Sequence, residues 1–138
     1  MNGGRLAGFI AVGGAMGALL RFVVSMAALA LWPDWSVAGT LIVNIFGSFA
    51  IGLGATWAVR RSLSPTLEAF LIVGFCGGFT TFSAFSLETV MLIVGGNWAG
   101  AGVYVLASVV LWLAAAWAGW TAGEWVFAGK PGHDHTKS

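Results

Sequence analysis

Four long apolar stretches, separated by short polar segments, dominate the chain. They run from about residue 6 to 31, 37 to 59, 67 to 94 and 99 to 127. Each is longer than the roughly 20 residues that an α-helix needs to cross the hydrocarbon core of a bilayer. The pattern therefore predicts an all-α integral membrane protein, in which residues 1–128 form one domain of four transmembrane helices. The polar segment 129–138 is expected to be a disordered tail.

The third apolar stretch is interrupted in its middle, near residues 76–80. Cys76-Gly77-Gly78 places two poor helix formers in succession, and hydroxyl and phenyl side chains follow at once. Lipid cannot pair the backbone groups that a broken helix frees, so such a break is tolerated only inside protein or beside a polar cavity. Broken helices at membrane depth are typical of sites that bind ions or substrates.

Composition narrows the class of protein. Hydrophobic residues make up 59% of the chain and charged residues 8%, against about a quarter charged in soluble domains. Cys76 is the single cysteine, which excludes an intrachain disulfide and a cysteine metal cluster. We find no catalytic triad, paired carboxylates or phosphate-binding glycine loop, and therefore expect no enzyme and no nucleic-acid partner. His133 and His135 lie in the polar tail, where a solvated role is expected rather than a metal site.

The cationic side chains are distributed unevenly. If four spans are numbered in order, both termini fall on one side of the membrane, together with five of the six lysines and arginines: Arg5, Arg60, Arg61, Lys130 and Lys137. Positively charged loops normally stay in the cytoplasm, so this count by itself predicts cytoplasmic termini.

Hydrogen-bonding side chains recur at helical spacing inside the spans. Thr40, Asn44 and Ser48 form one polar stripe on the second span, and Tyr104 and Ser108 form another on the fourth. Asn44 either bonds to a neighbouring helix or donates to a permeating anion. Apart from Glu68 at the very start of the third span, the acidic residues within the spans are Glu88 and Glu124, both near helix ends. An inventory rich in donors and poor in carboxylates favours an anion over a cation.

The segment after the glycine pair combines rings with hydroxyls. Phe82 and Phe85 share a helix face, and Thr81, Ser83 and Ser86 surround them. The rings either pack in a core or line an anion path with their electropositive edges. An anion that loses its water needs close donors to compensate.

Two charged side chains in the spans allow several interpretations. Arg21 lies deep in the first span, where it either reaches the nearby interface or faces a wet vestibule that attracts anions. Glu88 can pair with Arg21, face the same vestibule or reach the headgroups. Gly13 and Gly17 form a Gly-x-x-x-Gly pair, which favours close helix packing.

The run GFCGGFTTFSAFS at residues 74–86, with TLIVN at 40–44 and a glycine-rich first span carrying Arg21, resembles the Fluc fluoride channels, also called CrcB-like proteins. The resemblance extends over roughly residues 8–120. It implies a passive, selective fluoride channel of the cell inner membrane, built as an antiparallel, dual-topology homodimer with two pores. Dual topology implies little charge bias, whereas the cations of this chain gather on one side.

The resemblance also implies roles for particular residues. Phe82 and Phe85 correspond to the phenylalanines that line the fluoride path, and Asn44 to the polar residue beside them. Arg21 corresponds to the arginine of the vestibule, with Glu88 nearby. Main-chain carbonyls at the positions of Gly77 and Thr80 bind a structural Na⁺ at the dimer two-fold axis. Further candidates for the polar path are Thr40, Thr81, Ser83, Ser86, Tyr104 and Ser108.

Two other functions are compatible with four short spans. A small proton-coupled multidrug exporter would need a carboxylate in the first span, where this chain offers Arg21 instead. A non-conducting subunit of a larger membrane complex would leave the run of hydroxyls after Gly78 without a purpose.

Overall fold

The computed structural model describes residues 3–127, all of them in helices or short connections. α1 covers Gly3–Leu31, α2 covers Ala38–Arg61 and α6 covers Trp98–Phe127. The third span, Pro65–Val94, consists of α3 (Pro65–Glu68), the π-helix η1 (Ala69–Cys76), α4 (Gly77–Phe79) and α5 (Phe82–Val94). The prediction of four membrane-spanning helices with a broken third is therefore confirmed. The predicted tail, 129–138, with both histidines, lies outside the described residues.

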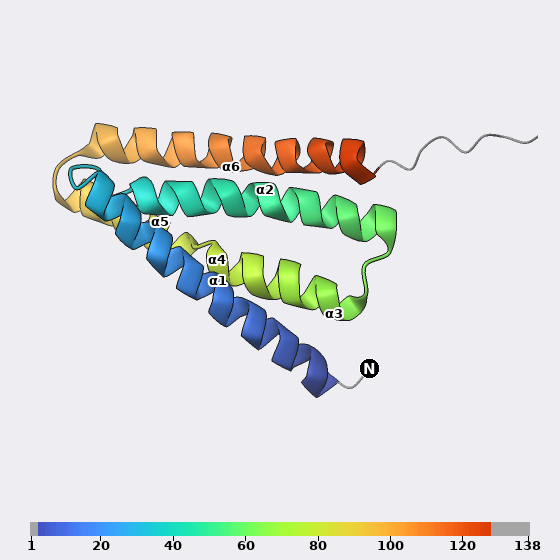
Figure 1. Ribbon diagram of the computed structural model, residues 1–138. Helices are drawn as coiled ribbons and strands as arrows, with labels where there is room; N and C mark the ends of the chain where they lie inside the picture. Colours follow the sequence, from blue (N-terminus) through green and yellow to red (C-terminus); the bar gives the residue numbers. More distant parts are fainter. Residues whose placement is uncertain (1–2, 128–138) are drawn as a thin grey trace, which may run out of the picture.

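The helices form two pairs (Figure 1). α2 and α6 run side by side along their whole length, and α1 crosses the first half of the third span. α5 leaves this half at the break and packs mainly against the beginning of α6. The start of α1 and the end of α6 lie at the same end of the molecule, as the chain crosses the membrane an even number of times.

Small residues let the helix backbones touch. A Cβ atom built at Gly13 or Gly17 would overlap the backbone of η1, and one at Gly119 would overlap the backbone of α2. Gly123 faces Thr56, whose hydroxyl donates to the carbonyl oxygens of Gly52 and Trp120 at 3.0 and 3.2 Å. Without a hydrophobic driving force between helices in lipid, such close contact supplies much of the association energy. The packing role predicted for the Gly13–Gly17 pair is confirmed.

The break lies slightly later than the glycine pair suggested. Gly77 and Gly78 are helical, and the backbone becomes extended at Thr80 and Thr81. Gly78 packs so closely on α1 that an added Cβ would overlap the carbonyl oxygen of Gly14. Gly78 therefore serves helix contact, and the extended residues that follow it open the helix.

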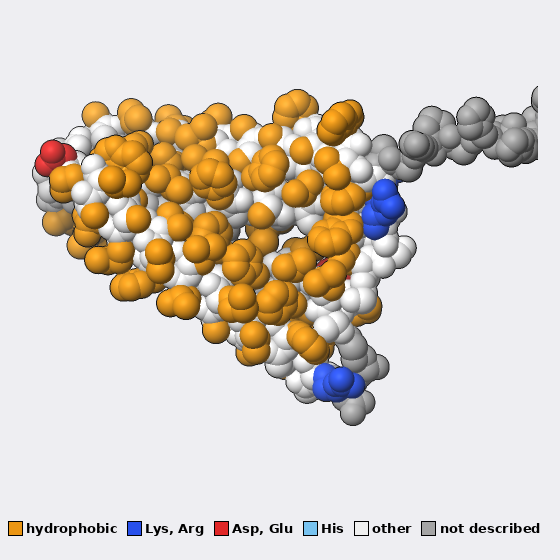
Figure 2. Space-filling model, viewed as in Figure 1, with side chains coloured by type: hydrophobic (Ala, Val, Ile, Leu, Met, Phe, Trp, Pro, Cys, Tyr) orange, Lys and Arg blue, Asp and Glu red, His pale blue; other side chains and the backbone are white. Residues whose placement is uncertain are grey.

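The outer surface suits a lipid environment. Apolar side chains cover the face seen in Figure 2, and the arginine side chains visible on that face gather at one end. The fully buried side chains are few and small, the largest being Val43, Thr56 and Ser108. The protein is a multi-pass membrane protein whose apolar residues contact lipid more than they fill a core.

Candidate functional site

The extended backbone at the break is held by side chains on both sides. Thr80 has φ −78° and ψ 156°, and its hydroxyl donates to the carbonyl oxygen of Cys76 at 2.9 Å. Thr81, with φ −148° and ψ 123°, caps α5 by accepting from the backbone N–H of Ala84 at 3.2 Å. This cap pairs one of the amides that the first turn of a helix leaves free.

Asn44 closes the break from α2. Its Nδ2 donates to the carbonyl oxygen of Thr81, and its Oδ1 accepts from the N–H of Thr81, each at 2.8 Å. The Asn44 side chain thus pairs both the N–H and the C=O of Thr81, as a neighbouring β-strand would. Both groups are buried, so Asn44 has a structural role in addition to any contact with an ion. One of its two amide hydrogens is left for a further acceptor.

The same geometry frees a carbonyl group on α4. In an uninterrupted helix, the N–H of Thr81 would donate to the carbonyl oxygen of Gly77, four residues earlier. Here that N–H donates to Asn44 instead. Gly77 is exposed, with no atom within 4 Å of the place where a Cβ would stand. An exposed main-chain oxygen without its helical donor is a suitable ligand for a hard cation.

Aromatic rings converge just after the break. Phe85 is buried, with 7% of its surface exposed, and its ring centroid lies 5.3 Å from that of Tyr104 and 4.9 Å from that of Trp112. The ring centroid of Phe82 lies 5.4 Å from that of Phe85, but 73% of the surface of Phe82 is exposed. The two phenylalanines thus contact each other, as their spacing predicted, yet only Phe85 is enclosed by this chain.

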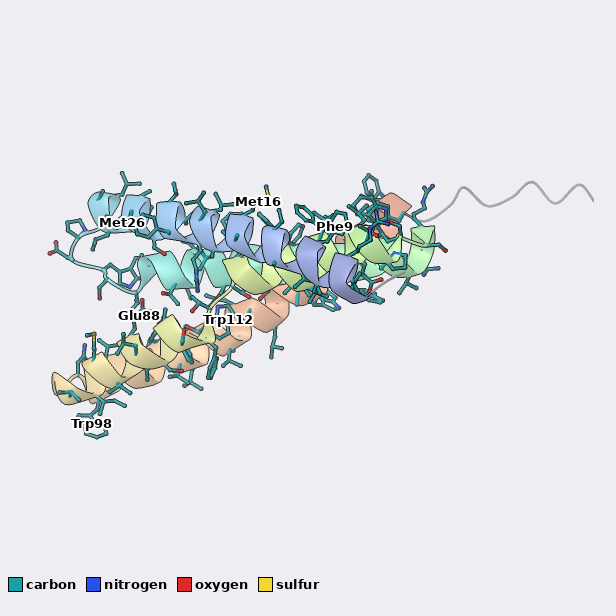
Figure 3. All side chains as sticks on the ribbon, turned by 90° about the horizontal axis from the view of Figure 1, so that it is seen from below. Phe9, Met16, Met26, Glu88, Trp98 and Trp112 are labelled. Atoms are coloured by element: carbon teal, nitrogen blue, oxygen red, sulfur yellow. The ribbon has the colours of Figure 1, made fainter. Side chains whose placement is uncertain are left out.

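Glu88 is bound in a way that the sequence did not reveal. Thr40 Oγ1 donates to one carboxylate oxygen at 2.7 Å, and Tyr104 Oη donates to the other at 2.6 Å. The carboxylate lies between α5 and the start of α2 (Figure 3). Glu88 therefore does not pair with Arg21 within residues 3–127. Thr40 and Tyr104, both expected to face an anion, have their protons directed at a carboxylate.

The remaining hydroxyls differ in how free they are. Ser83 shares a hydrogen bond of 3.2 Å with the Thr81 hydroxyl, and half-buried Ser86 donates to the carbonyl oxygen of Phe82 at 2.9 Å. Ser108 is completely buried, and its Oγ has no hydrogen-bond partner among the described residues. Arg21 is partly buried and makes no hydrogen bond or ion pair in that part of the chain.

A cleft connects several of these groups. It has a volume of about 210 Å³ and lies at the break, and we call it the break cleft. Among residues 3–127, no lysine, arginine or carboxylate lines it. The lining residues are Asn44, Ser48, Ile51, Thr80, Thr81, Phe82 and Trp112.

A second hollow, of about 360 Å³, opens between the α1–α2 and α5–α6 connections. Asp34, Trp35 and Asn97 stand at its rim, and Tyr104 lies among its lining residues.

Four of the predicted site residues, Asn44, Thr80, Thr81 and Phe82, line the break cleft. The others do not: Arg21, Thr40, Gly77, Ser83, Phe85, Ser86, Glu88, Tyr104 and Ser108. Sequence reasoning missed Trp112, which lines this cleft and contacts Phe85. Its position two turns after Tyr104 and one turn after Ser108 was an available signal, since the three share one helix face.

Comparison with known proteins gives a consistent picture. Residues 8–120 match the model of a family described as "CrcB-like protein, Camphor Resistance (CrcB)". The chain is 48% identical over 111 residues to a protein of Roseiflexus sp. (strain RS-1), covering 80% of this chain and 90% of the relative. It is 45% identical over 116 residues to a protein of Stutzerimonas stutzeri (strain A1501), covering 83% and 94%. Both relatives are named "Fluoride-specific ion channel FluC".

Proposed function

The chain belongs to the CrcB-like family, and we propose that it is a passive, selective fluoride channel that lets cytoplasmic fluoride leave the cell down its gradient. The observation that carries the proposal is the break cleft, where neutral donors and a phenyl ring meet without any fixed charge. The names of the relatives point to the same anion. A channel of this kind conducts ions and is not an enzyme.

The proposed path uses neutral groups for a physical reason. Fluoride is small and strongly hydrated, so dehydration must be offset by close, strong donors. Asn44 offers its second amide hydrogen, and Ser83, Ser86, Ser108 and the Thr81 hydroxyl are further donors. Phe82 and Phe85 present positive ring edges to the anion. Because no lysine or arginine lines the cleft, the ion is not trapped, which conduction requires.

Thr40, Tyr104 and Glu88 would act at the side of this path. Both hydroxyls donate their protons to the Glu88 carboxylate, so each could donate to fluoride only by breaking its hydrogen bond to Glu88. We assign Glu88 and Arg21 to the wet entrance, where Arg21, without a partner in residues 3–127, would raise the local anion concentration.

We further propose that two copies assemble as an antiparallel, dual-topology homodimer in the inner membrane. The exposed ring of Phe82, at 73%, is the main support, because a path-lining group should be enclosed. A second copy would also cover the outer face of α5.

Dual topology is tested by Asp34→Cys in sealed cells with an impermeant maleimide. Labelling of about half the copies supports it, and labelling of all or none refutes it.

A structural Na⁺ at the two-fold axis fits the donor set of this chain. Gly77 is exposed, its carbonyl oxygen has lost its helical donor, and Thr80 follows in an extended conformation. Carbonyl oxygens from both copies would form the site without any acidic side chain. When bound, the cation would neutralise the negative carbonyl end of α4 in each copy and join the two copies.

The decisive experiment is fluoride efflux from vesicles. Purified protein is reconstituted in liposomes loaded with KF, and a fluoride electrode records release after valinomycin is added. We expect rapid fluoride release and no chloride release from matched KCl vesicles. No fluoride release from well-folded protein would refute the proposal.

The same vesicles test the alternatives. A proton-coupled multidrug exporter is not favoured, as the first span carries Arg21 where such a mechanism needs a carboxylate. Fluoride flux that is unaffected by a proton gradient, with no uptake of lipophilic cations, would exclude that exporter. A purely structural subunit would be indicated by copurifying proteins together with no flux.

A further inference from the structure

The unpaired polar atoms of the structure are concentrated on one helix face. Within residues 3–127, the buried side-chain nitrogen and oxygen atoms without a hydrogen-bond partner are Ser108 Oγ and Trp112 Nε1. The two residues are one turn apart on α6, so they share a face. Buried polar groups are nearly always paired in native proteins, and an orphan needs an explanation. The described residues supply no acceptor for either of these two groups, which lie on successive turns.

The indole of Trp112 is held in a defined place. Its ring meets the ring of Phe85 edge to face, with centroids 4.9 Å apart and planes at 73°. It also lines the break cleft together with Asn44 and Phe82. Figure 3 shows Trp112 between α6 and the broken third span. Aromatic packing fixes the ring, while the nitrogen at its edge lacks an acceptor.

The chemistry of the orphan group specifies its ligand. An indole N–H donates and cannot accept, so its partner must be an acceptor. It carries no net charge, and it therefore holds an anion less firmly than an arginine would. A compact anion that accepts strongly is better suited to one fixed donor than a large halide with diffuse charge.

We propose that Trp112 donates from Nε1 to the permeating fluoride and passes the ion between Ser108 and the break cleft. This inference rests on the proposed function and adds a specificity-determining residue to it. The sequence of donors along the path is then Ser108, Trp112 and the free amide hydrogen of Asn44. Phe85 would contribute by holding the indole in register as well as by its own edge.

The test separates the N–H from the ring. Trp112→Phe keeps an aromatic ring but removes the donor, and we expect fluoride efflux to fall about tenfold or more, as loss of a strong hydrogen bond in the path implies. Trp117→Phe is the matched control, because Trp117 lies on the same helix with 71% of its surface exposed. We expect the control to conduct at the wild-type rate. Size-exclusion profiles and melting temperatures check that both variants are assembled.

A second measurement detects the hydrogen bond directly. In protein labelled with ¹⁵N-tryptophan, the indole resonance of Trp112 is the one missing from Trp112→Phe. Titration of the wild type with NaF should move this resonance downfield, and NaCl at equal ionic strength should leave it in place. If Trp112→Phe fails to assemble, Trp112 is assigned by elimination from single Trp→Phe variants of the other seven tryptophans.

The possible outcomes are distinct. If wild-type protein releases no fluoride, the proposed function itself is wrong. If the wild type conducts while Trp112→Phe conducts equally well, the channel stands and our inference about Trp112 is wrong. An indole resonance that ignores fluoride in a conducting wild type overturns the inference too. Slower flux together with a fluoride-specific shift supports it.

Discussion

Replacing Asn44 by alanine should disconnect α2 from the break in the third span. The Asn44 amide makes two hydrogen bonds of 2.8 Å to the backbone of Thr81, and only 5% of the surface of Asn44 is exposed. Alanine removes both partners and leaves a buried N–H and a buried C=O unpaired. Neither group can bond to lipid.

The expected loss of stability follows from these two groups. An orphaned buried backbone group is unfavourable by about 1–3 kcal/mol, so the pair amounts to roughly 2–6 kcal/mol. For a chain of this size, each kcal/mol lowers the melting temperature by about 4 °C. Asn44→Ala should therefore melt about 10 °C or more below the wild type, and its fluoride efflux should disappear because Thr81 no longer holds its place.

Thermal unfolding in detergent, followed by tryptophan fluorescence, measures the first effect. Ser48→Ala is the matched control: Ser48 lies one turn further along α2 and lines the same cleft. It makes no hydrogen bond in the described part of the chain, so the control should melt within about 2 °C of the wild type. If Asn44→Ala melted as late as Ser48→Ala, the amide would not support the break, and our account of it would be refuted.

Asn44→Asp separates support from conduction. The carboxylate can still accept from the N–H of Thr81 but turns an oxygen towards the carbonyl oxygen. A negative charge about 4 Å from the anion, at an effective dielectric constant of about 20, repels it by roughly 4 kcal/mol, or about 1,000-fold in occupancy. Normal fluoride efflux in this variant would exclude Asn44 from the path.

Phe82→Ile and Phe85→Ile should each slow fluoride release strongly in the vesicle assay, but only the substitution at buried Phe85 should also lower the melting temperature. Unchanged flux in both variants would remove the rings from the path. Glu88→Ala should destabilise the protein by a few kcal/mol, since two hydroxyls lose their shared acceptor, whereas Glu88→Gln should recover part of this loss. Equal melting temperatures of the two variants would contradict that network. Gly78→Ala should abolish folding because the new methyl group meets the α1 backbone, while Gly102→Ala, at an exposed position with open space for a methyl group, should leave the expressed, folded yield unchanged. A folded Gly78→Ala variant would show that α1 can move away.

The amino-acid sequence determined the membrane class and the number of spans. Both features depend on the total hydrophobicity of residues that are neighbours in the chain. Each stretch of some 20 apolar side chains partitions into lipid as a helix whose backbone groups are paired within it. The break in the third span was also visible in the sequence, since Gly77 and Gly78 and the hydroxyls after them are adjacent in the chain.

Only the tertiary structure decided which donors are free. Asn44 meets Thr81 across 37 positions, and Thr40 meets Glu88 across 48. Local periodicity shows that a side chain lies on a polar face, but a hydrogen bond depends on which distant group lies within about 3 Å. In the folded chain, residues that the sequence predicted as anion donors, such as Thr40 and Asn44, donate hydrogen bonds to other protein groups. Ser108 and Trp112 have no such partner among the described residues.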